Sequence, residues 1–378
     1  MKKLKVAIVI PTHTDAKSSL HVLLEVYNCL IKTKKIEATI FTDKYEGQDY
    51  KGFNIVKISS PDYNTLLSKF LLLLGLPRHY YSSLVEKLMG YDVIESSNPE
   101  FYLFAYESYL AARKYKTRLV LRTSQTVDGF FLFRFSKYFI LPFAKKAYDY
   151  CAFLLFTNPD AQARAERLGL VEKNSKRSIV TGHATDTAVF KPAKIKKSPD
   201  SGKKIILSVG GLYKIKGHHI IINSLAKVRQ KHDAELWIAG SGYYKKNLEA
   251  LCLQLGLSKH VRFLGSKAKE ELAVIYNMAD VFVLANYQEI TPAVNEALAC
   301  GVPVVVMECG GREFVLPNEG CGLISKKFDI EDMSEKIMRL LDNNDLAKRV
   351  AARGRARVIN NFSTENVAEK FYKAFTLK

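Results

Sequence analysis

The stretch VFVLANYQEITPAVNEALACGVPVVV, from Val281 to Val306, decides the fold. An apolar strand, a short polar turn, a helix and a second apolar strand follow one another, which predicts a compact β-α-β unit. Thr291 suits the N-cap, Pro292 suits the first helical position, and Gly301 suits the end of the helix. The exposed N–H groups of this helix would then lie at the carboxyl end of a parallel strand, where anionic ligands bind in open α/β sheets.

Two carboxylates, Glu289 and Glu296, flank the same helix start. A carboxylate does not hold a phosphate, but it accepts hydrogen bonds from sugar hydroxyls beside one. The local pattern therefore predicts a site for a phosphorylated, hydroxyl-rich ligand.

The whole chain has 378 residues, which suits two domains of ordinary size. Its net charge is +19, and residues 1–200 carry 31 Lys or Arg against 19 Asp or Glu. A basic surface fits nucleic acid, an anionic membrane or an anionic small ligand, and it also fits ordinary solvated faces. Since the sequence has no zinc-finger spacing, helix-turn-helix signature or RGG tract, no nucleic-acid partner is expected.

The six cysteines form no CxxC pair and no cluster with His, so buried free thiols and a reducing, cytoplasmic compartment are expected. The start of the chain, MKKLKVAIVIPTH, has a short apolar run and no cleavage signal, and it reads as a first buried strand. No stretch is apolar for long enough to span a bilayer.

The first half alternates strands and helices, which predicts a doubly wound parallel sheet. Strands are expected at residues 37–42, 53–58, 91–96 and 118–123. The polar turn after the first strand contains His13 and Asp15, which are candidates for contact with a ligand, as is Asp128 after the strand at 118–123.

Two apolar segments of the first half, 68–89 and 130–156, also carry basic residues. In the second segment these are Arg134, Lys137, Lys145 and Lys146. The segment fits a surface on the interface of an anionic membrane, which would make the protein peripheral on the inner face of the cell membrane. A core helix with snorkelling cations, followed by a buried strand, fits as well.

A stretch rich in Lys, Pro and Ser predicts a linker at 193–204, between a first domain (1–192) and a second domain (205–360). Residues 361–378 predict a C-terminal helix, for which packing back on the first domain is one arrangement. In the second domain, Gly210-Gly211 and Gly240 follow predicted strands. Their glycines permit close backbone approach, and Lys216 supplies a point charge for a phosphate.

The motifs SVGGLYKIKG, ELWIAGSG, VRFLGS, YNMADVFVLANYQE, NEALACGVPVV and ECGGREFV occur in this order. Together they resemble the retaining glycosyltransferases of family 4, of the group 1 type, from about Gly182 to the end of the chain. The resemblance implies the GT-B fold, two Rossmann-like domains facing a cleft. The first (1–192) would bind the acceptor, with His13, Asp15 and Asp128 as candidates, and the second (205–360) would bind the nucleotide sugar. The resemblance also implies transfer of a sugar from a UDP- or GDP-linked donor to a glycan or lipid-linked acceptor, with no cofactor and no metal.

The resemblance also assigns roles in the donor site. Lys216 would bind the diphosphate, together with the turn at Gly210, Gly211 and Gly240. The start of the helix (Thr291, Pro292, Ala293) would direct N–H groups at the phosphates. Glu296 would accept bonds from the ribose hydroxyls, and the nucleobase would lie near Leu264, Gly265 and Ser266.

The chain departs from the family in four places. The Gly-Gly turn that the family has in its first domain is replaced by Thr12 to Ser19. Gly211 stands where the family has an Arg on the diphosphate. The family has two glutamates separated by seven residues. If Glu296 is one of them, the other has two candidates here: Gln288 lies at the family spacing, and Glu289 lies one residue closer to Glu296. The usual histidine of the first domain has no match. These departures keep open a second hypothesis, a catalytically weakened binder of nucleotide or glycan that serves as a partner subunit.

Overall fold

The computed structural model describes residues 3–10, 17–33, 35–43, 52–59, 81, 83–99, 103–124, 136–194 and 202–377. The chain divides into two compact units. Met1–Ala184 and Thr364–Lys378 form the first, and Thr185–Ser363 forms the second. The chain therefore enters the second unit eight residues before the predicted linker, and it returns to the first unit for its last helix.

The first unit is built on a parallel sheet with the strand order β3-β2-β1-β4-β5-β6-β7. Its elements are β1 (Leu4–Val9), α1 (Lys17–Lys32), β2 (Ile36–Thr42), β3 (Asn54–Lys57), α3 (Leu84–Lys87), β4 (Val93–Ser97), α4 (Leu103–Tyr115), β5 (Arg118–Thr123), α5 (Ser136–Tyr150), β6 (Phe153–Phe156), α6 (Pro159–Arg167), β7 (Ser178–Val180) and α14 (Thr364–Thr376). The four predicted strands are confirmed, each with ends within two residues of the prediction.

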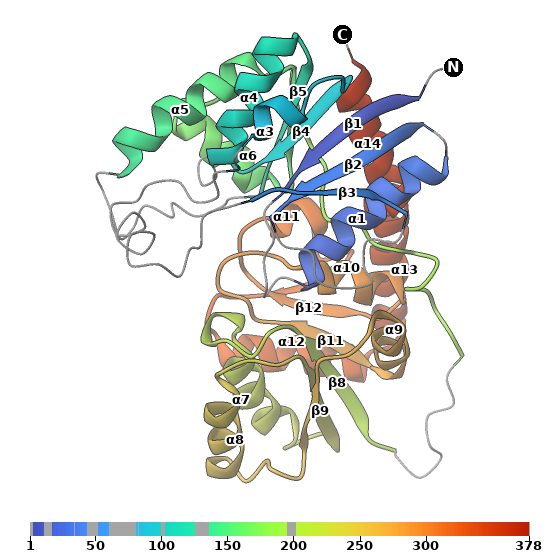
Figure 1. The fold of residues 1–378 in the computed structure, drawn as a ribbon. Coiled ribbons are helices and arrows are strands. Elements are labelled where there is room, and N and C mark those ends of the chain that lie inside the picture. Colours follow the sequence, from blue (N-terminus) through green and yellow to red (C-terminus); the bar gives the residue numbers. More distant parts are fainter. Residues whose placement is uncertain are drawn as a thin grey trace. The chain divides into compact units, whose positions relative to one another are not determined.

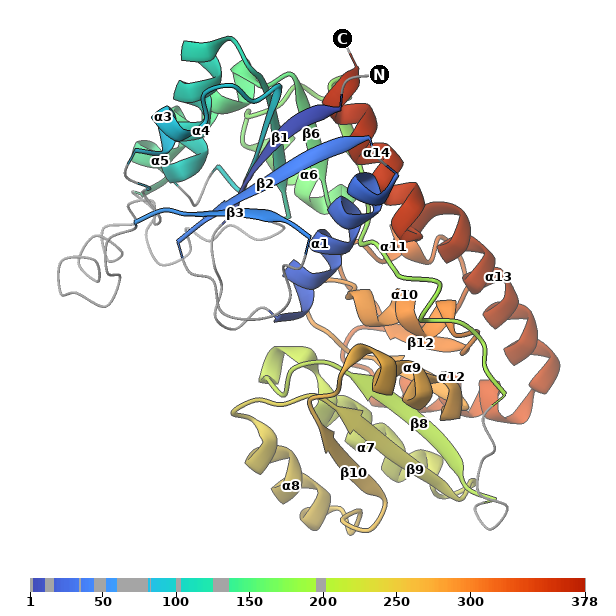
Figure 2. The same cartoon turned by 45° about the vertical axis from the view of Figure 1, so that its right-hand side comes forward.

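Alternation along β1 divides the core of this unit between the two faces of its sheet. Val6 and Ile8 pack with residues of α1 and α14, whereas Ala7 and Val9 pack with residues of α3, α4 and α5. Figures 1 and 2 show the same layers, with α1 and α14 on one face of the sheet and α3, α4 and α5 on the other. The C-terminal helix thus completes the core of the first unit.

The second unit is built on a parallel sheet with the strand order β10-β9-β8-β11-β12-β13. Its elements are β8 (Lys204–Val209), the 3-10 turn η3 (Lys214–Lys216), α7 (His218–Val228), β9 (Ala234–Ala239), α8 (Lys245–Gln254), β10 (Val261–Gly265), α9 (Lys269–Met278), β11 (Val281–Leu284), α10 (Pro292–Ala299), β12 (Val304–Met307), α11 (Arg312–Val315), β13 (Leu323–Ser325), α12 (Ile330–Asp342) and α13 (Asn344–Phe362).

Both faces of this second sheet are also covered. Val281 and Val283 of β11 pack with α7, α8 and α12, and Phe282 and Leu284 pack with α9, α10 and α13. Because the central strands are buried on both faces, they are continuous apolar runs rather than alternating ones. Helix α10 begins at Pro292 and ends at Ala299, with Gly301 at φ 75°, in agreement with the prediction from the sequence.

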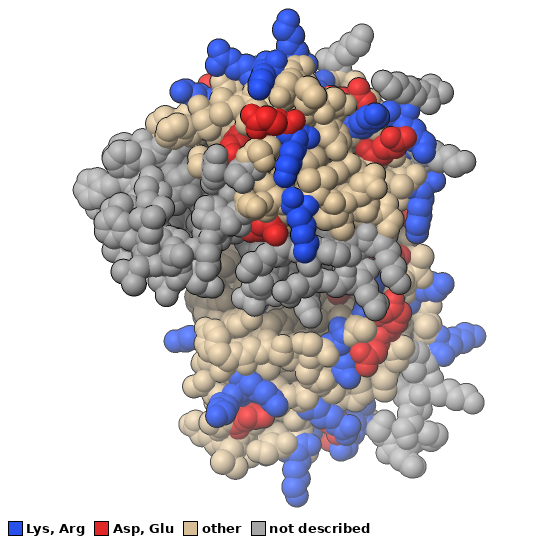
Figure 3. All heavy atoms as spheres, in the orientation of Figure 1, with Lys and Arg blue, Asp and Glu red and all other residues tan. Residues whose placement is uncertain are grey.

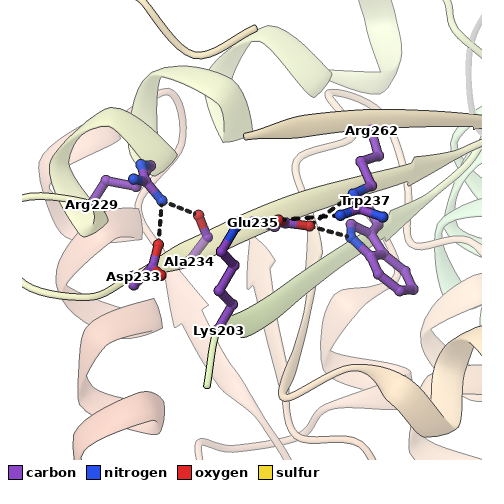
Figure 4. Close-up of polar contacts among 7 residues, drawn as sticks. All are labelled: Lys203, Arg229, Asp233, Ala234, Glu235, Trp237 and Arg262. Carbon is purple, nitrogen blue, oxygen red and sulfur yellow. Dashed lines mark hydrogen bonds and ion pairs between the residues drawn. The ribbon is translucent and has the colours of Figure 1, made fainter. Parts of the chain in front are cut away.

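At the amino end of β9 the second sheet holds a buried carboxylate. Glu235 accepts from Lys203 (3.0 Å), from the indole of Trp237 (3.2 Å) and from Arg262 (2.8 Å). Figure 4 shows these three side chains converging on Glu235, with Arg229 joined to Asp233 and Ala234 nearby. Burial alone would raise the pKa of Glu235, but these partners lower it below its ordinary value. The cluster pins the strand at the end opposite to Gly240, so it belongs to the framework of the sheet.

Among the described residues, no helix is both long and apolar enough to cross a membrane. All six cysteines are free thiols, and Cys151, Cys252 and Cys300 are buried. On the face drawn in Figure 3, Lys and Arg side chains are spread over the surface with Asp and Glu among them.

Candidate functional site

The strand order of the second unit reverses between β8 and β11, which are hydrogen-bonded neighbours. From β8 the chain proceeds outward to β9 and β10, and from β11 it proceeds the other way to β12 and β13. The loops that follow β8 and β11 therefore leave the sheet in opposite directions, and such a switch point is where open α/β sheets bind ligands. The predicted donor residues lie on these two loops and on the turns after β9 and β10.

The two loops at the switch point touch through their backbones. Gly217 has φ 70°, and a Cβ there would lie 2.0 Å from the carbonyl oxygen of Ala285. The amide of Tyr287 donates to the carbonyl of Ile215 (3.0 Å), which joins the loops a second time. Only glycine fits at position 217, because a side chain would meet backbone rather than a movable group.

The turns after β8 and β9 are also in close contact. Gly240 has φ 145°, and a Cβ there would lie 1.9 Å from the carbonyl oxygen of Gly210. The amide of Gly210 donates to Ala239 (2.9 Å), and that of Gly240 donates to Gly265 (2.8 Å). The predicted residues Gly210, Gly240 and Gly265 thus stand on three adjacent strand ends.

Lys216 and Glu289 lie close enough at the switch point for their charges to interact. Lys216 ends η3, and burial lowers its pKa while the charge of Glu289 raises it. Glu289 is half-buried and pairs through its backbone with Gly310, whereas Gln288 is exposed. Of the two candidates for the second glutamate, Glu289 is therefore the one whose charge acts on Lys216.

Helix α10 begins beside this pair, with Thr291 at the N-cap and Pro292 as the first residue. The side chain of Thr291 makes no capping bond, although the sequence favoured one, and its Oγ1 is buried with no hydrogen-bond partner among the described residues. The cap is backbone only, since Val294 N–H bonds the carbonyl of Thr291 (3.1 Å). Ala293 follows Pro292 in the first turn and is buried.

Glu296 lies one turn further along α10 and is half-buried. Its Oε2 accepts a hydrogen bond of 2.7 Å from the hydroxyl of Tyr276 on α9. Tyr276 is wholly buried, and burial together with the charge of Glu296 raises its pKa well above the ordinary value, so it stays a donor. Tyr276 was not among the predicted site residues, since it precedes Glu296 by 20 residues on another helix. The available signal was a Tyr within an apolar helix, because a buried phenol needs a partner.

The turn after β10, at the predicted nucleobase position, is hydrogen-bonded to the turn after β9. Gly265 ends β10 at φ 71°, with no atom within 4 Å of the place where a Cβ would stand, and Ser266 follows it. The hydroxyls of Ser266 and Ser241 are hydrogen-bonded at 2.8 Å, which links the turns after β9 and β10.

Gly211 stands where the resemblance leads one to expect Arg, and the ring of Tyr213 fills the adjoining space. A Cβ at position 211 would lie 2.5 Å from Cε2 of that ring. Tyr213 is 39% exposed and packs in a tilted pair with Tyr243, whose ring centroid is 5.4 Å away. A longer side chain at position 211 requires the Tyr213 ring to move.

His218, the first residue of α7, is a further residue of the site region that was not predicted from the sequence. It is 2% exposed, its Nδ1 lies 3.3 Å from the hydroxyl of Ser208, and its Nε2 side faces the backbone of Gly210 and Gly211. Burial lowers the pKa of His218 to about 4. The imidazole is therefore neutral under the predicted diphosphate turn at neutral pH.

The three candidates for acceptor contact, His13, Asp15 and Asp128, lie outside the described residues, as do the side chains of Arg134 and Lys137. At the carboxyl edge of the first sheet the structure does describe a buried ion pair. Glu95 is fully buried and accepts from Arg122 at 3.0 Å. Within the described ranges, no group of three or more His, Cys, Asp or Glu side chains is arranged to hold a metal ion.

Comparison with solved structures identifies the architecture. A glycosyltransferase from Rickettsia africae matches with a TM-score of 0.77 at 17% identity, covering 99% of both chains. Anabaena HepE, solved in complex with UDP and glucose, matches with a TM-score of 0.77 at 15% identity, covering 99% of this chain and all of that one. The predicted GT-B fold, with two parallel-sheet α/β units, is therefore confirmed.

Sequence comparison finds relatives of the second unit. Residues 190–357 match the model of the group 1 glycosyl transferases, and these residues include the whole of the site described above. An uncharacterized glycosyltransferase of Methanocaldococcus jannaschii is 31% identical over 46% of this chain and 45% of its own length. The lipopolysaccharide core biosynthesis glycosyltransferase LpsE of Rhizobium meliloti is 26% identical over 60% of this chain and 64% of its own, so each match spans less than two thirds of the relative. The likeness to the group 1 glycosyl transferases thus lies in the second unit of the chain.

Proposed function

We propose that this protein is a retaining glycosyltransferase of family 4 that transfers a sugar from a UDP- or GDP-linked donor to a glycan or lipid-linked acceptor. One observation carries the proposal. Lys216 and Glu289 lie on the two loops at the β8/β11 switch point of a group 1 domain, and Glu296 lies on α10, which follows the second loop. The UDP and glucose bound by Anabaena HepE are consistent with a nucleotide-sugar donor.

In the proposed mechanism, protein charge and dipoles stabilise the departing nucleoside diphosphate without a metal or other cofactor. Lys216 provides the positive charge, and the first-turn N–H groups of α10 provide the positive end of the helix dipole. Both groups lie beyond the carboxyl ends of β8 and β11, where positive charge and dipole are in place before charge develops on the leaving oxygen. Partial burial of Lys216 strengthens its interaction with the diphosphate.

The two glutamates have separate roles in this proposal. Glu296 accepts hydrogen bonds from the ribose hydroxyls, and Glu289 accepts from a hydroxyl of the transferred sugar. Support for Glu289 over Gln288 comes from its electrostatic contact with Lys216, since the transferred sugar is attached to the diphosphate that Lys216 would bind. A charged acceptor also makes a stronger hydrogen bond than an amide does.

A screen of nucleotide sugars tests the proposal. The purified protein is incubated with UDP- and GDP-sugars and with membrane or glycan acceptors, and released nucleotide and product configuration are measured. We expect release from one donor class, with the anomeric configuration retained. An inverted product, or no release from any donor, would contradict the proposal.

One observation favours the alternative of a nucleotide-binding partner subunit. The Tyr213 ring occupies the space beside Gly211, so one of the two cations of the family is replaced by an aromatic ring. A partner subunit would bind nucleoside diphosphate in the same assay but release none from any donor.

We also propose that the protein is cytoplasmic and that its first unit makes peripheral contact with an anionic membrane. Phe143 and Tyr150 on α5 are 44% and 40% exposed, and Lys146 lies 5.9 Å from the centroid of the Phe143 ring. Exposed rings beside cations suit the interfacial region of a bilayer. Binding to vesicles with anionic lipid should weaken in Lys146→Glu, and unchanged binding would favour a core helix with snorkelling cations.

A further inference from the structure

The hydrogen bond between Tyr276 and Glu296 joins helix α9 to helix α10. Tyr276 is the eighth residue of α9, and Glu296 is the fifth residue of α10. The donor is the Tyr276 hydroxyl and the acceptor is Glu296 Oε2, 2.7 Å away. This length is typical of a hydroxyl bonded to a carboxylate.

The phenol ring is itself fixed. It is 0% exposed, and it packs edge-on against Phe190 and at a tilt against Phe282, with both centroids 5.8 Å away. A buried ring between two aromatic neighbours has one rotamer, so its hydroxyl is a stationary donor. Glu296, by contrast, has a flexible side chain and is only half-buried. The hydrogen bond from this fixed hydroxyl therefore restricts the conformations of the Glu296 carboxylate.

We propose that Tyr276 is a positioning residue that fixes the Glu296 carboxylate for the ribose hydroxyls, and so sets the preference for ribonucleotides over deoxyribonucleotides. The inference rests on the proposed function, which assigns Glu296 to the ribose. A carboxylate accepts up to about four hydrogen bonds, so accepting from Tyr276 leaves it able to accept from ribose as well. Fixing the carboxylate in advance lowers the side-chain entropy lost on binding.

A second neighbour of Glu296 lies on α10 itself, at its C-cap. Cys300, one turn after Glu296, has its pKa raised to about 12 by burial and by that carboxylate, so it remains a neutral thiol. Glu296 thus has a donor on α9 and a neutral neighbour on its own helix.

The test compares Kd values of the tighter-binding nucleoside diphosphate (UDP or GDP) and its 2′-deoxy analogue for wild type and Tyr276→Phe. Phe keeps the ring packing and removes only the donor. We expect the ribonucleotide to bind about five- to tenfold more weakly to Tyr276→Phe, with the deoxy analogue within about twofold of wild type. The matched control is Tyr148→Phe, a buried tyrosine of the first unit, which should change neither Kd.

Glu296→Ala with and without Tyr276→Phe completes a double-mutant cycle. Once Glu296 is replaced by Ala, we expect Tyr276→Phe to cause no further loss of ribonucleotide affinity. The double variant has no Glu296 carboxylate, so none is left without the Tyr276 donor. Equal weakening of both ligands by Tyr276→Phe, or additive losses in the cycle, would overturn the inference. Wild-type protein that binds neither nucleotide would instead overturn the proposed function on which it rests.

Discussion

The backbone at Gly217 approaches the carbonyl oxygen of Ala285 so closely that a Cβ at position 217 would lie 2.0 Å from that oxygen. This contact joins the loop after β8 to the end of β11 at the point where the strand order reverses. Lys216 precedes the contact directly, and Asn286 to Glu289 follow it. The distance between the Lys216 loop and the Glu289 loop of the proposed donor site is therefore fixed by a backbone contact.

Gly217→Ala should damage the site more than the same change at another left-handed glycine. Gly256 has φ 69° and nothing within 4 Å of a Cβ position, so Gly256→Ala carries only the conformational cost of about 1 kcal/mol. Gly217→Ala adds displacement of Ala285, which is expected to raise the total loss to several kcal/mol. Thermal unfolding and nucleotide affinity of both variants measure the difference. Equal effects at the two positions would show that the close approach has no energetic weight.

Glu289→Gln should reduce kcat about 10- to 100-fold, because it removes the charge facing Lys216 and the strongest acceptor for the donor sugar. Gln288→Ala should stay within about twofold of wild type, since the Gln288 side chain is exposed. Steady-state kinetics on the best donor compares the two. A large loss for Gln288→Ala with little for Glu289→Gln would assign the sugar contact to Gln288.

Gly211→Arg restores the cation that the family has at this position, but the Tyr213 ring lies 2.5 Å from the new Cβ. Exchange of Tyr213 for Ser clears that space. We therefore expect Gly211→Arg with Tyr213→Ser to raise kcat/KM about tenfold over Tyr213→Ser alone, and Gly211→Arg alone to gain less. If neither variant gains activity, the missing Arg is not what limits the leaving group.

The stability of the protein should fall as pH decreases from about 6.5 toward 4. His218 has its pKa lowered to about 4 by burial, so below its ordinary pKa the unfolded chain binds a proton that the folded chain does not. The loss is on the order of 3 kcal/mol, complete near pH 4. His218→Asn keeps a polar atom for Ser208 and should flatten this slope, as measured by urea unfolding at about pH 7 and pH 5. An unchanged slope in His218→Asn would assign the effect to other groups, among which His183 titrates in the same window.

Much of the second unit could be predicted because its signals are local. The strand VFVL, the N-cap at Thr291, the start at Pro292 and the stop at Gly301 are close neighbours whose preferences agree. The contacts that decide the site are not local. Tyr276 meets Glu296 from another helix, and the Tyr213 ring fills the place beside Gly211, so no spacing rule reveals either. The missing capping bond of Thr291 shows the same limit, since its backbone stands at the predicted N-cap while its side chain makes no capping bond.

Calorimetric titration of wild-type protein and Glu296→Ala with UDP and GDP decides whether the β8/β11 switch point is a nucleotide site. Glu249→Ala on α8, which removes a surface carboxylate paired with Lys245 at 3.4 Å, serves as the control. We expect one nucleotide to bind wild type and the control equally, and Glu296→Ala at least about tenfold more weakly. Equal binding to all three proteins, or no binding of either nucleotide to wild type, would refute the assignment of the site.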